Sequence, residues 1–136
     1  MSNSFVKPEY IDSDLTGRII GCAMLVHNAL GNGFAESIYQ RSLEIEMRDQ
    51  TVNFTREYDM PIHYKGQIVG RRRVDFLVEE RIAVELKAVI EIDNGHLAQA
   101  INYLEAYNLQ TGLLINFGSR KLQYHRLTNL KFKRNV

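Results

Sequence analysis

Apolar residues recur at helical spacing in three segments of the chain. The first segment spans about residues 15–30 and ends at the glycine turn Gly31-Asn32-Gly33. The second follows at once and spans about residues 34–48. The third spans residues 93–108, and Asp93 stands where an N-cap residue is expected. These three segments predict helices.

Runs of β-branched and aromatic residues predict strands in the rest of the chain. They cover residues 52–59, 62–65, 68–78, 82–89, 112–117 and 122–127. Turns at Gly66 and Gly118 separate neighbouring runs. The order of elements is therefore α-α-β-β-β-β-α-β-β, which predicts an α/β (α+β) fold.

Alternation of apolar residues predicts how one hairpin is paired. Seven apolar positions lie two apart on its two strands: Val74, Phe76, Val78, Ile82, Val84, Leu86 and Ala88. All seven share the core face only if Val78 pairs with Ile82 across the loop Glu79-Glu80-Arg81. A slip of one residue would move every side chain to the wrong face, so this register is a strong expectation.

The predicted register gathers charged residues on the opposite face of the hairpin. It places Asp75 opposite Glu85 and Arg73 opposite Lys87. One interpretation is a solvated outer face with cross-strand ion pairs. The other is a centre that binds a divalent cation and a phosphate, because paired carboxylates suit a hard cation and an ammonium suits a phosphate.

Length and charge narrow the picture only slightly. The chain has 136 residues, so we expect a single domain over residues 1–136, with loose tails at 1–10 and 130–136. Lys and Arg number 17 against 16 Asp and Glu, so net charge gives no case for nucleic-acid binding. Any basic surface must be local, and the densest basic segments are 71–73 and 131–134.

The single cysteine, Cys22, limits the redox and metal chemistry of the chain. One thiol excludes an intrachain disulfide and a cysteine-based metal site within one chain, and it indicates a reducing cytoplasm. Its place on an apolar helix face predicts a core residue. No apolar run is long enough to span a bilayer, so we expect no membrane partner.

Two helical features change the balance between the interpretations. Glu36 starts the second helix, where it is either a partner of the helix dipole or a third carboxylate at the same centre. Gln99 and Tyr103 lie four residues apart on the third helix and share a face. They form either the polar edge of an amphipathic helix or a pair that holds a phosphate backbone.

These residues together resemble the GxxExxY family, a branch of the PD-(D/E)XK nuclease superfamily. The family motif is present as Gly33, Glu36 and Tyr39, and the superfamily motif as Asp75 followed by Glu85-Leu86-Lys87. Gln99 and Tyr103 match the QxxxY motif of related exonuclease branches. Val74 stands where the superfamily name has proline, a departure that many branches share. The resemblance covers about residues 15–127 and implies a restriction-endonuclease-like core, a mixed central sheet flanked by helices.

The resemblance implies a nuclease that uses magnesium or manganese. Asp75, Glu85 and the Leu86 carbonyl would bind the metal, and Glu36 would reach it directly or through water. Lys87 would orient the attacking water or stabilise developing charge. Tyr39 is expected in the core. The substrate-binding residues would be Gln99, Tyr103 and Arg73.

Two other functions compete with the nuclease. The first is a catalytically silent nuclease-fold module that binds nucleic acid or protein, which the balanced charge favours and the retained acids and lysine disfavour. The second is a histidine metal site, but the four histidines show no H-x-x-x-H or H-E-x-x-H spacing. The expected partner is nucleic acid, with DNA placed ahead of RNA, and a homodimer is left open.

Overall fold

The computed structural model describes residues 12–134, and the predicted tail at 1–10 lies outside the described residues, as do residues 135–136 of the C-terminal tail. Its elements follow in chain order: α1 (Ser13–Leu30), α2 (Glu36–Asp49), β1 (Phe54–Tyr64), β2 (Gln67–Val78), β3 (Ile82–Lys87), α3 (Asn94–Tyr107), β4 (Thr111–Asn116) and β5 (Gln123–Thr128). The predicted fold class and order of elements are confirmed. The two short strands expected at 52–59 and 62–65 are joined as the single strand β1.

Pro61 explains why the sequence suggests a break in β1. Proline has no N–H to donate to a ladder, so it is tolerated in a sheet at an edge strand. β1 is such an edge strand, because the sheet order is β1-β2-β3-β4-β5. The strand continues through Pro61, and its pairing with β2 shifts register only between Ile62 and His63.

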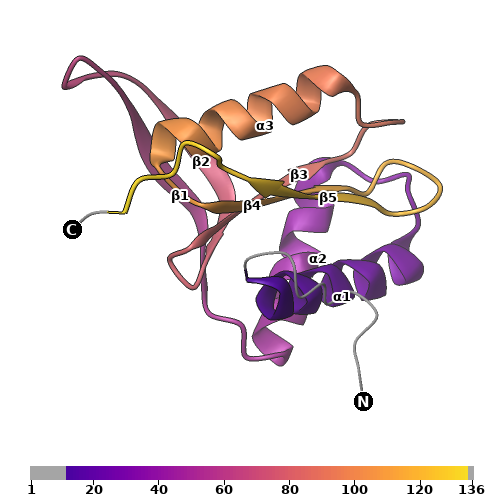
Figure 1. Cartoon of the computed structure of the whole chain (residues 1–136). Helices are drawn as coiled ribbons and strands as arrows, with labels where there is room; N and C mark the ends of the chain where they lie inside the picture. The colour runs from indigo at the N-terminus through magenta and orange to yellow at the C-terminus, as the bar shows by residue number, and fades with distance from the viewer. Residues whose placement is uncertain (1–11, 135–136) are drawn as a thin grey trace.

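The sheet is mixed and lies between two layers of helices. Only β3 and β4 are paired in parallel, and α3 forms the crossover between them; the other neighbours are antiparallel. In Figure 1, α1 and α2 cover one face of the sheet and α3 covers the other. Within residues 12–134, no helix combines the length and the apolar character needed to cross a membrane.

Each face of the sheet has its own hydrophobic core. On one face, α1 and α2 contribute buried residues such as Ile19, Leu43 and Met47, which pack with the sheet. On the other face, α3 contributes Ala100 and Leu104. Strand β4 is buried along its whole length, as expected for the segment 112–117. The sheet interior can therefore hold a charged side chain only where that side chain has a partner.

Cys22 and Tyr39 are core residues, as the sequence predicts. Both side chains are buried in the core between the sheet and the first two helices. Burial raises the pKa of the Cys22 thiol to about 11, so the thiol stays protonated and unreactive. The Tyr39 hydroxyl donates to the Gly31 carbonyl at 2.6 Å and accepts from the Phe34 N–H at 3.1 Å, which ties the glycine turn to α2.

The predicted register of the β2–β3 hairpin is confirmed at its closed end. Val78 pairs with Ile82 and Phe76 with Val84. The expectation that Val74 shares a face with Phe76 is wrong, because Val74 packs in the core on the α3 side and Phe76 in the core on the opposite side. The alternation of side chains is lost at this point, beside Glu57 of β1, which has a left-handed φ of 53°.

The ladder between β2 and β3 starts at the hairpin loop and ends at the pair Phe76↔Val84, so it does not reach Asp75. The expected pairings of Asp75 with Glu85 and of Arg73 with Lys87 are therefore both absent from it. Beyond this point the side chain of Asp75 continues the link between the strands, because its Oδ2 accepts the Leu86 N–H at 2.8 Å. The end of the ladder thus places a carboxylate where a backbone carbonyl would otherwise stand.

The hairpin loop provides a test of backbone strain. Glu79 and Glu80 have left-handed φ angles of 52° and 56°, which glycine adopts without penalty. We expect Glu80→Gly to stabilise the protein by about 1 kcal/mol, which corresponds to a rise in Tm of roughly 3–5 °C. Thermal unfolding followed by circular dichroism measures the change. Arg81→Gly is the control, because Arg81 is not left-handed and glycine there should only destabilise.

Candidate functional site

Four of the predicted residues meet where α2 begins and the β2–β3 ladder ends. Glu36 is the first residue of α2, Asp75 lies near the end of β2, and Glu85 and Lys87 belong to β3. Their charges act on one another, because both Glu36 and Glu85 are affected by Asp75 and Lys87. Partial burial and then the charge of Asp75 raise the pKa of Glu36.

An open cavity of about 290 Å³ lies on the α2 side of this cluster. It is lined by Glu36, Ser37, Gln40, Glu57 and Asp75. Three of these five residues carry carboxylates, so the cavity is strongly acidic. A cation or a cation-bound phosphate is the ligand that such a lining favours.

Gln40 is a site residue that the sequence analysis missed. Its Nε2 donates to Asp75 Oδ1 at 2.8 Å, and its Oε1 accepts from Arg56 at 3.2 Å. Gln40 lies four residues after Glu36 in α2, so both side chains point to the same side of the helix. A polar residue one turn after Glu36, on the side of the helix that faces the sheet, was the available signal.

Arg72 is the second residue that the sequence analysis missed. Its guanidinium pairs with Glu85 Oε2 at 3.1 Å and lies 4.1 Å from the centre of the Tyr103 ring. Its side chain is only 28% exposed, against 56% for Arg71 and 73% for Arg73. Of the three consecutive arginines, Arg72 is therefore the one that faces the protein interior and balances the buried acid.

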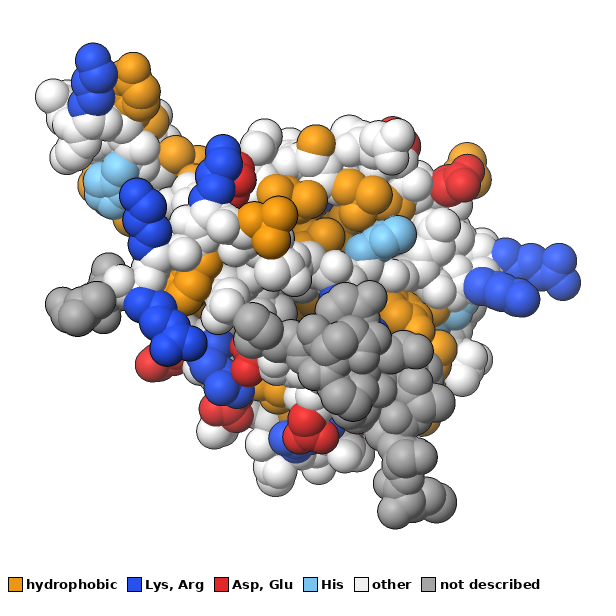
Figure 2. All heavy atoms as spheres, viewed as in Figure 1, with side chains coloured by type: hydrophobic (Ala, Val, Ile, Leu, Met, Phe, Trp, Pro, Cys, Tyr) orange, Lys and Arg blue, Asp and Glu red, His pale blue; other side chains and the backbone are white. Residues whose placement is uncertain are grey.

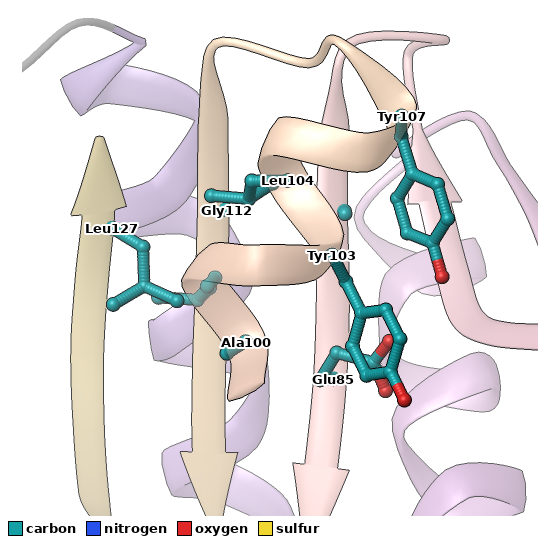
Figure 3. A pocket seen from close by; sticks show the side chains of 9 residues that line it. Glu85, Ala100, Tyr103, Leu104, Tyr107, Gly112 and Leu127 are labelled. Carbon is teal, nitrogen blue, oxygen red and sulfur yellow. The ribbon is translucent and has the colours of Figure 1, made fainter. Parts of the chain in front are cut away.

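Glu85 is a buried acid that is only partly satisfied. Burial raises the pKa of Glu85 to about 7; the positive charge of Arg72 lowers it, and the negative charge of Asp75 adds to the rise. Its Oε1 has no hydrogen-bond partner among the described residues, and the same is true of the Tyr107 hydroxyl. Figure 3 shows Glu85 reaching from β3 toward the rings of Tyr103 and Tyr107 on α3.

This raised pKa predicts how stability depends on pH. The folded protein holds the Glu85 proton up to about pH 7, whereas the unfolded chain loses it near 4.5. The stabilisation of the folded state by protonated Glu85 is therefore fully present below pH 4.5 and is lost as the pH rises through 7. We expect wild type to lose about 2–3 kcal/mol of unfolding free energy relative to Glu85→Gln over this range. Urea unfolding at several pH values measures it, and parallel curves would contradict the assignment.

The site has side chains of the kind that bind a divalent cation, but these side chains are not arranged as a metal site in the structure. Oxygen donors dominate the cluster, one buried carboxylate oxygen lacks a partner among the described residues, and burial, together with the charge of Asp75, raises the pKa of Glu36 and Glu85. Yet among residues 12–134 no three His, Cys, Asp or Glu side chains are already grouped so as to hold a metal ion. The carboxylates of Asp75 and Glu85 are instead engaged by Gln40, the Leu86 N–H and Arg72.

The predicted substrate-binding residues lie at different distances from the cluster. Tyr103 joins it through the Arg72 guanidinium. Gln99 is exposed one turn earlier on α3. Arg73 is exposed on β2, and its guanidinium lies 3.8 Å from the Glu57 carboxylate. The structure thus brings Tyr103 into the site, whereas Gln99 and Arg73 lie on the surface around it.

Asn116 holds the chain segment that follows Lys87. Its side chain is fully buried and bonds both the N–H and the C=O of Val89, at 3.0 and 2.9 Å. It also accepts from the Gly118 N–H and donates to Gln123. A Cβ at Gly118 would overlap the Val89 backbone, so the close approach requires glycine there. Asn116 therefore fixes the exit of β3, where Lys87 is placed.

Two of the four histidines, His27 and His96, have structural roles, and none of the described histidines belongs to a group that could hold a metal ion. His96 and Asp93 form a capping box at the start of α3, with bonds of 2.9 and 3.1 Å. The His96 N–H lowers the pKa of Asp93. His27 is buried and its Nε2 lies 3.0 Å from the Ser119 carbonyl oxygen. A histidine metal site therefore finds no support.

Comparisons with known proteins address the family directly. The family model described as PD-(D/E)XK nuclease superfamily matches residues 13–127, which is most of the chain. Among solved structures, the crystal structure of SSO0001 is similar, with a TM-score of 0.56 and 15% sequence identity. That match covers 81% of this chain and 58% of the SSO0001 chain, and at this identity it shows the fold alone. A comparison with curated proteins gave no match. The chain therefore belongs to the PD-(D/E)XK nuclease superfamily.

Proposed function

We propose that this chain hydrolyses phosphodiester bonds of nucleic acid with the help of a divalent cation. The observation that carries the proposal is the electrostatically coupled cluster of Glu36, Asp75, Glu85 and Lys87 beside an acidic cavity. In a chain of a nuclease superfamily, this cluster combines carboxylates for a cation with an ammonium for developing negative charge. The proposal treats residues 1–136 as one domain that acts in a reducing cytoplasm.

The proposed metal ligands are Asp75, Glu85 and the Leu86 carbonyl, with Glu36 as a direct or water-mediated ligand. Magnesium and manganese suit this set, because both favour oxygen ligands and few carboxylates. When bound, such a cation polarises the scissile phosphate and lowers the pKa of the attacking water. Among the described residues Glu85 Oε1 has no partner and would be the oxygen offered to the cation, whereas Arg72 holds Oε2 at 3.1 Å.

The remaining residues have positioning roles in the proposal. Lys87 orients the attacking water or stabilises charge on the phosphate. Gln99, Tyr103 and Arg73 hold the substrate strand on the surface around the cluster. Within the superfamily, the GxxExxY branch is proposed for this chain on the motif Gly33, Glu36 and Tyr39, of which Tyr39 is a core residue. DNA is proposed ahead of RNA as the substrate.

One observation favours a second candidate, a silent module that binds nucleic acid or protein. Both acids of the superfamily motif already have partners within the protein: Gln40 and the Leu86 N–H for Asp75, and Arg72 for Glu85. A scaffold that has lost catalysis would keep such internal partners and would bind no metal. The nuclease proposal requires instead that these acids also bind a cation, for which Glu85 Oε1 has no competing partner among the described residues.

A cleavage panel tests the proposed function. Labelled single- and double-stranded DNA and RNA are incubated with wild-type protein and magnesium or manganese, beside Lys87→Ala. We expect cleavage of at least one substrate by wild type and none by Lys87→Ala, because only the variant lacks the ammonium beside the phosphate. Equal cleavage by both proteins would show that the activity comes from elsewhere.

A thermal titration separates the nuclease from the silent module. Metal that binds only the folded state raises Tm as its concentration increases. We expect such a rise with manganese for wild type and for Lys87→Ala, but a much smaller one for Glu85→Gln. A flat response in wild type supports the silent module instead.

A further inference from the structure

The β1–β2 hairpin continues well beyond the rest of the sheet. Strand β2 pairs with β3 only from Phe76 to Val78, whereas its pairing with β1 continues from Tyr58↔Val74 out to Tyr64↔Gln67. We call residues 58–74 the arm. Seven residues of strand give it a length of about 20–25 Å. Its base packs against the body, since Val74 and Met60 belong to the core on the α3 side. Figure 2 shows its outer part as a lobe that stands away from the body, with basic side chains at its end and near its base.

One side of the arm leads directly to the acidic cavity. Arg71 and Arg73 lie two and four residues before Asp75, so the three alternate onto the same side of β2. Contacts across the strands agree, because Arg71 pairs with Asp59 and Arg73 lies 3.8 Å from Glu57, a residue of the cavity lining. We call this side the outer face, and it forms a row of guanidinium groups that ends at the candidate site.

The arm is far more basic than the chain as a whole. Residues 58–74 hold four of the 17 Lys and Arg residues and one of the 16 Asp and Glu residues, a net charge of +3 against +1 for the whole protein. One of the four, Arg72, faces the interior and pairs with Glu85, so Lys65, Arg71 and Arg73 are the basic residues of the arm's surface. The ion pairs on the outer face are exposed, and exposed pairs contribute little. Arg71 and Arg73 are therefore available to phosphates.

The arm has the shape of a duplex-binding element. A two-stranded β-ribbon fits the major groove of double-stranded DNA, and cations along it contact the phosphate backbone. Proteins that hold single strands instead stack successive bases on a row of aromatic rings, whereas the outer face carries a row of arginines. Its tip adds exposed apolar groups, with Tyr64 65% and Val69 64% exposed.

We propose that the arm binds double-stranded DNA next to the bond that is cleaved, with Arg71 and Arg73 on consecutive phosphates and the tip in or against the groove. This proposal rests on the proposed function only in saying that a bond next to the arm is cleaved. It extends that function by naming the substrate class as a duplex that continues from Asp75 along the outer face. A second copy of the chain is the competing occupant of the apolar tip.

Duplex binding without metal tests this proposal. A labelled duplex of about 20 base pairs is titrated with protein in EDTA and followed by fluorescence anisotropy at several salt concentrations. We expect the double variant Arg71→Ala/Arg73→Ala to bind at least about tenfold more weakly. The slope of log affinity against log salt concentration should decrease by the amount that about two phosphate contacts contribute. Arg71→Lys/Arg73→Lys should retain most of the affinity, because it keeps both charges.

The matched control removes two exposed basic residues away from the arm. Arg120→Ala/Lys121→Ala alters the loop between β4 and β5 and should leave the affinity for the duplex unchanged. Circular dichroism checks that all variants are folded. Because the assay contains no metal and measures no cleavage, its result does not depend on whether the chain is a nuclease.

Three outcomes would overturn the proposal. The first is an equal loss of affinity in the arm variant and the control variant, which would assign the effect to overall charge. The second is a single strand of the same length that binds as tightly as the duplex and loses as much affinity with the arm variant. The third is that Ile68→Ser/Val69→Ser converts a dimer to a monomer in analytical ultracentrifugation without weakening duplex binding per protomer, which would assign the tip to a second copy.

Discussion

Asp75→Asn is expected to reduce metal-dependent cleavage by roughly a thousandfold or more, while the protein stays folded. The substitution keeps an oxygen that can accept the Leu86 N–H, which now lies 2.8 Å from Oδ2. It removes the negative charge that a cation needs. It also replaces Oδ1, which accepts from Gln40 Nε2, by an amide NH2 group, so that two hydrogen-bond donors face each other. Single-turnover cleavage measures the activity, and urea unfolding measures the stability.

Asp49→Asn is the matched control for that experiment. Asp49 is an exposed acid, the last residue of α2, and it lies outside both the acidic cavity and the arm. Its loss should leave the rate of cleavage within a factor of about two, because an exposed charge away from the site is screened by solvent and salt. A similar rate for Asp75→Asn and wild type would show that Asp75 binds no catalytic metal.

Asn116→Ala is expected to lower the free energy of unfolding by about 3–4 kcal/mol, the largest effect on stability that we predict. The side chain of Asn116 satisfies the N–H and the C=O of Val89 and the N–H of Gly118. Without it these backbone groups lose their partners inside the protein, and each such group costs about 1–3 kcal/mol. Urea unfolding by circular dichroism measures the change.

Asn102→Ala is the control for the asparagine. Asn102 is exposed on α3, where alanine is a better helix former, so its replacement should change stability by less than about 0.5 kcal/mol. If Asn116→Ala unfolds like this control, the bonds to Val89 do not support the exit of β3. Hydrogen exchange at Val89, two residues after the end of β3, provides a local readout, since its amide should lose protection in Asn116→Ala well before the amides of β3.

The sequence was sufficient to predict most of the fold. Helical spacing located α1, α2 and α3 within a few residues, and the capping residue Asp93 marked the start of α3. The apolar alternation predicted the pairing of Val78 with Ile82, because only one register buries the apolar side chains of both strands. Pro61 wrongly suggested a break in β1. A sheet accepts proline in an edge strand, and the order of the strands, which makes β1 an edge, is known only from the whole sheet.

The candidate site was predicted less completely. The motif residues Glu36, Asp75, Glu85 and Lys87 lie close enough for their charges to act on one another. The shared face expected for Asp75 and Glu85 is not observed, because Asp75 bonds Gln40 of α2 whereas Glu85 pairs with Arg72 beside Tyr103 of α3. The face of Val74 was predicted wrongly, since strict alternation was assumed through a point where it is lost. The left-handed backbone of Glu57 lies on the neighbouring strand, and nothing within β2 itself signals it.

By itself, the sequence determined the elements, the hairpin register and the set of charged residues that meet at its end. Those features depend on local periodicity and on short connections, both of which can be inferred from neighbouring residues. The tertiary structure decided the partners of the acids: Gln40 for Asp75 and Arg72 for Glu85. These contacts join segments 35 and 13 residues apart, and each depends on how α2 and α3 pack on opposite faces of the sheet. The same packing decides that Arg72, of the three adjacent arginines, turns inward. Its partner is the charge of Glu85, which is buried only once the helices and the sheet are assembled.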